Sequence, residues 1–150
     1  LAQRYDVVVT TAARWAIADA SAASFIDAWR PVRAAGTEVI VIAPVPEVSA
    51  AMFECIHRRT AELADCKTPR ATAFSTPDVL RAAALESGTT LIDLSDFYCD
   101  AEACPAVIGD AFVFRDRVGH VSGTYGATLA PFLGDALQAV LQQSSDGGVR

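Results

Sequence analysis

One of the two histidines of the chain stands in a polar segment where it could act as a general base. His120 lies in RDRVGHVSGTYGATLAP, residues 115–131, and Asp116 precedes it by four residues. Imidazole titrates near neutral pH, so it can take a proton from a hydroxyl group. A neighbouring carboxylate can fix its tautomer and stabilise the imidazolium. The same pattern fits an ordinary loop histidine ahead of a helix that Ser122 caps, so both interpretations stay open.

Other side chains that could bind a substrate occur in two places. Arg14 and Trp15 follow the first predicted strand, where the indole could stack on a sugar ring or belong to the core. His57 stands beside Arg58 and Arg59 in CIHRRT. This second group is typical of a solvated helix face, and the alternative is a site for a glycan or an anion.

The four cysteines are spaced as two close pairs. The patterns C-x10-C and C-x4-C favour the disulfides Cys55–Cys66 and Cys99–Cys104, with a zinc site or buried free thiols as alternatives. One unbroken helix over 55–66 would hold its end Cα atoms roughly 16 Å apart, too far to bond. A disulfide between Cys55 and Cys66 therefore requires that the helix predicted near 47–64 is interrupted between them. Two disulfides would place the domain outside the cytoplasm.

Composition indicates a folded domain. The 150 residues are 52% hydrophobic and 20% charged, and the net charge of −6 argues against nucleic-acid binding. The longest apolar run, residues 39–45, is too short to span a membrane. We expect one domain over 1–142 and a flexible polar tail over 143–150. Because the chain starts with Leu1 and not Met, we expect a mature product or a fragment of a longer protein.

Strand and helix signals alternate along the chain. The predicted strands are 5–10, 37–44 and 89–95. The predicted helices lie near 22–35, 47–64, 75–88 and 122–142. This order predicts an α/β fold: a three-layer, flavodoxin-like sandwich with a mostly parallel sheet. In such folds the active site lies beyond the carboxyl ends of the strands.

Local signals add detail to two of these elements. In the helix over 75–88, Thr76 is the predicted N-cap and Gly88 the predicted end. Residues 105–116 predict a hairpin that turns at Gly109 and Asp110.

The segment CDAEACPAVIGDAFVFRDRVGHVSGTYGATLAPFL, residues 99–133, resembles the last conserved block of SGNH-type hydrolase domains. More narrowly, it is similar to the SGNH domain fused to acyltransferase-3 membrane proteins, which O-acetylate bacterial surface glycans. Those domains share a short cysteine loop, a hairpin after Cys-Pro, and an Arg-Asp…His pattern before a Thr-Tyr pair and the last helix. The likeness covers about 35 residues, and the strand–helix order agrees over the rest.

The resemblance implies an O-acyltransferase with a Ser-His-Asp-type site and no cofactor or metal. His120 would be the base and Asp116 its orienting carboxylate, and the acyl group, expected to be acetyl, would pass through an acyl-serine. The acceptor would be a hydroxyl of a cell-surface glycan or glycolipid. The domain itself would be soluble, on the extracytoplasmic face of the membrane, covalently linked to an upstream membrane acyltransferase domain.

Three features depart from the SGNH pattern. No Gly-Asp-Ser occurs, so we expect the N-terminal strand and the nucleophile block to lie upstream and this chain to be inactive alone. There is no asparagine for the oxyanion hole, so Thr11 or backbone N–H groups of TTAARW, with Arg14 and Trp15 nearby, would replace it. The spacing is Asp-x-x-x-His and not Asp-x-x-His, with Arg117 at the usual aspartate position.

Two other functions fit the same fold. One is a non-catalytic glycan-binding or accessory module that uses Trp15 with Arg14, Arg58 and Arg59. The other is a secreted SGNH esterase.

Overall fold

The structure is a computed structural model that describes residues 5–58 and 62–147, with side chains as far as residue 143. It divides into two compact units. The first unit comprises Leu1–Pro44, Asp78–Asp93 and Phe132–Arg150, and the second comprises Val45–Pro77 and Leu94–Pro131.

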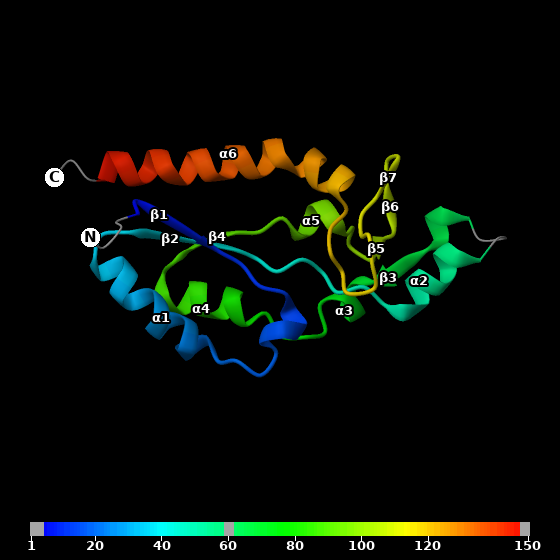
Figure 1. Cartoon of the computed structure of the whole chain (residues 1–150), viewed down its shortest axis with the longest axis horizontal. Coiled ribbons are helices and arrows are strands. Elements are labelled where there is room, and N and C mark those ends of the chain that lie inside the picture. The colour runs from blue at the N-terminus through cyan, green and yellow to red at the C-terminus, as the bar shows by residue number, and fades with distance from the viewer. Residues whose placement is uncertain (1–4, 59–61, 148–150) are drawn as a thin grey trace. The chain divides into compact units, whose positions relative to one another are not determined.

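The first unit is built on the predicted parallel sheet. Its strands are β1 (Val7–Thr10), β2 (Glu38–Ile42) and β4 (Thr90–Ile92), in the order β1-β2-β4 and all parallel. Helices α1 (Ala22–Ala34) and α4 (Val79–Ser87) pack on each other and on the sheet, and residues 132–147 of α6 run on its opposite side (Figure 1). The fold is therefore α/β with a mostly parallel sheet, which confirms the predicted class.

The core of this unit explains why these segments become strands and helices. After Glu38 the central strand β2 is apolar, and its Val39, Ile40 and Val41 are almost fully buried, as expected for a strand covered on both faces. Trp29 of α1 packs with Leu80 of α4 in the same cluster, so α1 buries an apolar face against α4.

The start of α4 differs from the prediction. Asp78, and not Thr76, is the N-cap, because its Oδ1 accepts the backbone N–H of Arg81 at 2.8 Å. The Thr76 hydroxyl donates to Glu47 Oε2 instead. The predicted end is correct: Gly88 has φ +62°, a left-handed conformation that suits glycine.

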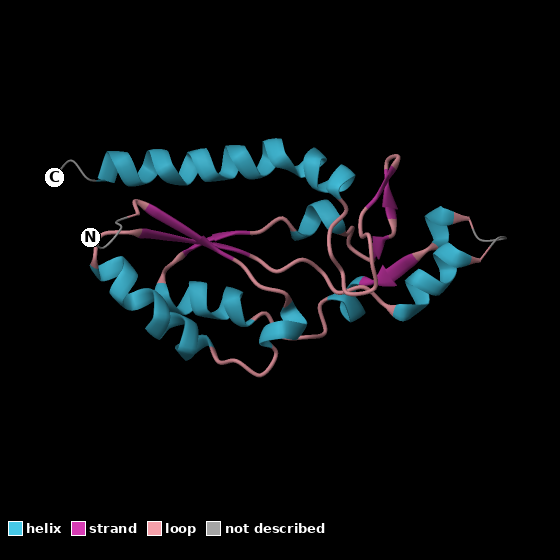
Figure 2. Ribbon diagram, viewed as in Figure 1, coloured by secondary structure: helices cyan, strands magenta, loops and turns pink. Residues whose placement is uncertain are grey.

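The second unit consists of short elements (Figure 2). Its helices are α2 (Ala50–His57), α3 (Arg70–Ala73) and α5 (Ser95–Tyr98), followed by the start of α6 (Gly123–Gly147). Its strands form two antiparallel pairs, β3 (Lys67–Pro69) with β5 (Ala103–Pro105) and β6 (Val107–Ile108) with β7 (Ala111–Phe112).

The second of these pairs is the predicted hairpin, and its turn contains Gly109 at φ +57°. The β3–β5 pair was missed, because three-residue strands show no alternation of apolar and polar residues.

Both predicted disulfides are present, Cys55–Cys66 and Cys99–Cys104, and no cysteine is free. Helix α2 ends at His57, and the Cα atoms of Cys55 and Cys66 lie 5.4 Å apart. The break in the helix that this bridge requires is therefore confirmed, and the zinc and free-thiol alternatives are excluded. Cys66 and Cys104 are almost fully buried in the core of the second unit.

The last helix, α6, starts where Ser122 accepts the backbone N–H of Tyr125 at 3.1 Å, which confirms Ser122 as a cap. Its backbone stays helical to Gly147, past the predicted end at Gln142. None of the helices in the described ranges is long and apolar enough to cross a membrane.

We expect the longer disulfide loop to stabilise the protein more. Cys55→Ala/Cys66→Ala should lower the free energy of unfolding by about 3 kcal/mol, from the chain entropy of the open loop. Cys99→Ala/Cys104→Ala, which opens a shorter loop, should lower it by about 2 kcal/mol. Urea unfolding of the purified protein measures both values, and a larger loss for the second variant would contradict the expectation.

Candidate active site

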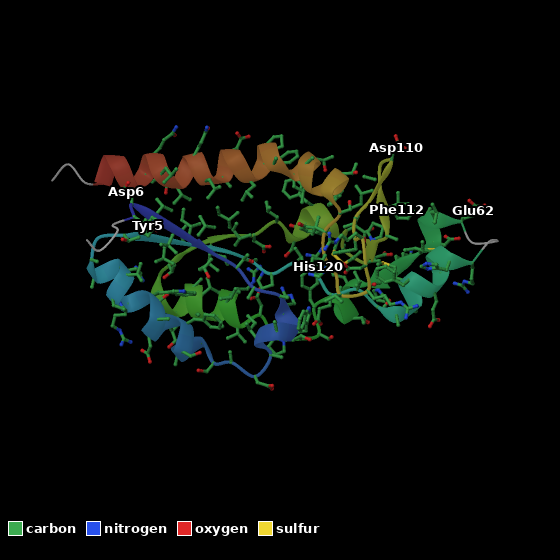
Figure 3. All side chains as sticks on the ribbon, in the orientation of Figure 1. Tyr5, Asp6, Glu62, Asp110, Phe112 and His120 are labelled. Carbon is green, nitrogen blue, oxygen red and sulfur yellow. A yellow bond between two sulfur atoms is a disulfide. The ribbon has the colours of Figure 1, made fainter. Side chains whose placement is uncertain are left out.

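His120 stands at the end of a loop that backbone pairing closes. We call residues 115–120 the His120 loop. Phe114 and Val121 form an antiparallel bridge at its base, and the Arg115 N–H donates to the His120 carbonyl at 2.9 Å. Within the loop, the Gly119 N–H donates to the Asp116 carbonyl at 3.2 Å. The loop is therefore defined by main-chain hydrogen bonds, and Figure 3 labels His120 on it.

The structure brings the two predicted catalytic side chains together. His120 Nδ1 lies 2.8 Å from Asp116 Oδ2. Asp116 Oδ1 accepts the backbone N–H groups of Val118 at 3.1 Å and of His120 at 3.2 Å. The hydrogen bond from His120, with support from these N–H groups, lowers the pKa of Asp116 below its ordinary value. The carboxylate is thus charged at neutral pH and able to stabilise an imidazolium.

The imidazole presents its other nitrogen to a reactant. The His120 side chain is 58% exposed, and no hydrogen bond of Nε2 occurs within the described residues. With Nδ1 held by Asp116, Nε2 is the atom that can accept a proton. The spacing Asp-x-x-x-His therefore does not prevent the carboxylate from reaching the ring.

Gly119 allows Asp116 to contact His120 although three residues, and not the usual two, lie between them. Its φ of +88° lies in the left-handed region, which residues with a side chain adopt at a cost. A Cβ atom at this position would lie 3.7 Å from Val48 Cγ2, which is an ordinary contact. The requirement for glycine is thus conformational and not steric. Sequence reasoning missed this residue, although a glycine directly before the histidine was the available signal.

The start of α6 fixes the far end of the loop. The Ser122 hydroxyl donates to the Phe112 carbonyl, and the Tyr125 hydroxyl donates to the Phe97 carbonyl. Tyr98 packs against Tyr125, with ring centroids 5.7 Å apart, and against Phe114 at 6.2 Å. Burial raises the pKa of Tyr98 to about 12. A buried aromatic cluster therefore supports the base of the His120 loop.

The residues predicted for the oxyanion hole or for substrate contact, Thr11, Arg14 and Trp15, belong to the first unit, whereas His120 belongs to the second. Thr11 is exposed just after β1. Trp15 lies in the 3-10 helix Arg14–Ile17 and is 56% exposed, so it is not part of the core. The structure thus leaves Thr11 and Trp15 accessible, and the roles predicted for them remain predictions.

Arg14 has a different environment. Its side chain is only 4% exposed, and its Nη2 lies 3.1 Å from Oδ2 of Asp78, whose side chain is 9% exposed. Arg81 contacts the same carboxylate at 3.5 Å. It also donates a hydrogen bond to Asp93, and this bond raises the pKa of Arg81. Arg14 therefore belongs to a charge network that holds the start of α4 and the end of β4.

The His57 group is organised differently from the His120 loop. His57 Nδ1 contacts the carbonyl of Phe53 at 2.7 Å within its own helix, and Arg58 is exposed. Arg59 lies outside the described residues. In the part of the chain that the structure describes, no three His, Cys, Asp or Glu side chains are grouped so that they could hold a metal ion.

Comparison with protein families gives a match over most of the chain. Residues 1–135 match the model of the SGNH domain (fused to AT3 domains), and the chain therefore belongs to this family of SGNH domains. Neither the curated proteins nor the solved structures yield a match. The family indicates an activity of the esterase or acyltransferase type, in a domain associated with an AT3 acyltransferase domain.

We expect Gly119→Ala to loosen the contact between Asp116 and His120. The forced change of φ should release the carboxylate, so the pKa of Asp116 rises toward its ordinary value. Carboxyl ¹³C titration of Asp116 measures this shift. Gly109→Ala is the matched control, because Gly109 is also left-handed but lies in the hairpin turn. Each variant should lose about 1 kcal/mol of its free energy of unfolding, because alanine is strained at a positive φ. If the pKa of Asp116 rises equally in Gly109→Ala, the role of Gly119 is refuted.

Removing the buried guanidinium should destabilise the first unit. Arg14→Met leaves Asp78 buried without its closest cation, so the free energy of unfolding should fall by about 3 kcal/mol. Arg30→Met is the control, because the Arg30–Asp27 pair is exposed on both sides and its loss should cost less than about 1 kcal/mol. Urea unfolding measures both free energies. If the two variants lose the same amount, the buried ion pair stabilises the protein no more than the exposed one.

Proposed function

We propose that this domain transfers an acyl group, acetyl in the first instance, to a hydroxyl of a cell-surface glycan. The observation that carries the proposal is the 2.8 Å contact between His120 Nδ1 and Asp116 Oδ2, which leaves Nε2 available to a reactant. Membership of the SGNH family supports acyl-ester chemistry at this pair.

In the first half of the proposed reaction, a serine oxygen attacks the acyl carbonyl carbon of the donor. His120 Nε2 takes the serine proton, the bond from the carbonyl carbon to the donor oxygen breaks, and the imidazolium returns the proton to that oxygen. In the second half, a sugar hydroxyl attacks the acyl-serine and gives its proton to Nε2. The new ester bond forms, and the serine oxygen leaves with the proton. Asp116 stabilises the imidazolium in both halves.

The nucleophile is assigned to no serine of these 150 residues, since Gly-Asp-Ser does not occur among them. The oxyanion donors are proposed to include Thr11 or backbone N–H groups after β1. Functional tests therefore use the full-length natural protein.

The proposed location is the extracytoplasmic face of a bacterial membrane, next to an AT3 domain in the same protein. Two disulfides in 150 residues support an oxidising compartment. The AT3 domain would supply the acyl group, and the family's association with such domains supports this arrangement.

A second candidate is a non-catalytic glycan-binding module on the same fold. The specific observation that favours it is Trp15, a large aromatic side chain that is 56% exposed. Such a ring can stack on the apolar face of a sugar.

The test is labelling of the full-length protein with a serine-directed fluorophosphonate, together with acetyl transfer to a soluble glycan. His120→Ala should lower both rates by roughly 100-fold or more, because a general base is lost. His57→Ala is the control, because this second exposed histidine has no carboxylate partner among the residues that the structure describes. It should leave both rates unchanged.

Each other outcome has a distinct meaning. Unchanged labelling in His120→Ala contradicts the assignment of the base. Saturable glycan binding without acyl turnover favours the accessory module. Release of free acid with no sugar ester identifies an esterase, with water as the acceptor.

A further inference from the structure

The arginines of the chain differ in what their guanidinium groups contact. Five of them each bind a carboxylate or a backbone carbonyl: Arg14, Arg30, Arg33, Arg70 and Arg81. Arg70 is typical of this group, since it donates to the carbonyls of Cys99 and Asp100 and to the Asp96 carboxylate. These five side chains are already engaged in holding elements of the fold together.

The two arginines of the His120 loop have fewer partners. Arg117 is exposed and makes no hydrogen bond or ion pair within the described residues. Arg115 is 66% exposed, and its only ion pair there is a long one, with Nε 3.4 Å from Asp116 Oδ2. Both guanidinium groups therefore keep most of their N–H donors for solvent or for a ligand.

The single carboxylate between them can neutralise only one of the two arginines. Asp116 Oδ1 accepts hydrogen bonds from two backbone N–H groups of the loop. Its Oδ2 contacts His120 Nδ1 at 2.8 Å and Arg115 Nε at 3.4 Å. The loop therefore keeps an excess of positive charge in the segment that holds the imidazole.

The position of the two arginines relative to the base is set by the backbone. Arg115 lies opposite His120 across the closed loop, where its N–H donates to the His120 carbonyl. Arg117 follows Asp116 directly in the chain. A group bound by these two side chains would lie beside the reacting atom and not at a remote surface.

We infer that Arg115 and Arg117 bind an anionic group, a carboxylate or a phosphate, on the substrate that reacts at His120. The inference rests on the proposed function and narrows its substrate class to anionic molecules. The planar guanidinium matches the two oxygens of a carboxylate or phosphate and forms charge-assisted hydrogen bonds. Because the chain carries a net charge of −6, an anion needs such a local cationic site to approach the base.

The kinetic test uses the full-length protein and two acceptors that differ in one group, methyl glucoside and methyl glucuronide. Arg115→Gln and Arg117→Gln should each raise KM for the glucuronide about tenfold, with kcat unchanged. KM for the glucoside should not change. High salt should reduce the difference between the wild-type protein and the variants.

Lys67→Gln is the matched control. Lys67 is also an exposed cation of the second unit and makes no ion pair within the described residues, but it lies in β3 and is not part of the His120 loop. It should leave both KM values unchanged. An equal effect of Lys67→Gln would show that net charge and not a local site is responsible.

A second arm locates the anion on the acceptor or on the acyl donor. Hydrolysis of a neutral aryl acetate is compared with that of the same ester carrying a ring carboxylate. If the arginine variants raise KM only for the charged ester, the site serves the donor. If they raise KM only for the glucuronide, the site serves the acceptor.

A binding measurement keeps the inference independent of turnover. Glucuronate and inorganic phosphate are titrated separately while the ring NMR signals of His120 are followed. At least one of them should shift these signals saturably in the wild-type protein and not in Arg115→Gln/Arg117→Gln. Absence of such a shift with both anions, or a shift that the double variant retains, overturns the inference. Absence of acyl transfer to either acceptor contradicts the proposed function alone.

Discussion

The geometry of the candidate site depends on one carboxylate that accepts three hydrogen bonds. Two of the donors to Asp116 are backbone N–H groups of its own loop, and the third is the ring of His120. The loop therefore fixes the carboxylate, and the carboxylate in turn orients the imidazole. Gly119 allows this closure because it adopts a left-handed conformation directly before the histidine. An exposed histidine is thereby held in a single orientation without being buried.

The elements behind this loop are short, so their stability has to come from more than hydrophobic packing. The strands of the second unit contain two or three residues each, and such strands bury little apolar surface. Two disulfides and the aromatic cluster of Tyr98, Phe114 and Tyr125 provide the remaining constraints. The first unit has a continuous buried strand and a helical layer instead, and contains no disulfide.

Sequence reasoning succeeded where a local pattern was strong. The parallel sheet followed from apolar runs that alternate with helices, and the disulfides followed from cysteine spacing. Prediction from the sequence failed where an element was very short, or where two neighbouring residues fitted the same role. The β3–β5 pair has too few residues for a periodicity, and Thr76 and Asp78 are both good N-caps, so only the position of the first helical turn decided between them.

The sequence by itself determined the order of elements, the cysteine pairs, the SGNH resemblance and the pairing of Asp116 with His120 as a hypothesis. Tertiary structure decided which charged side chains are engaged. Arg14 is buried against Asp78, whereas Arg115 and Arg117 remain exposed beside the base. The physical reason is that burial and ion pairing depend on segments distant in the chain, such as Asp78, which lies 64 residues after Arg14. A contact between residues so far apart in the sequence cannot be predicted from a local pattern of residues.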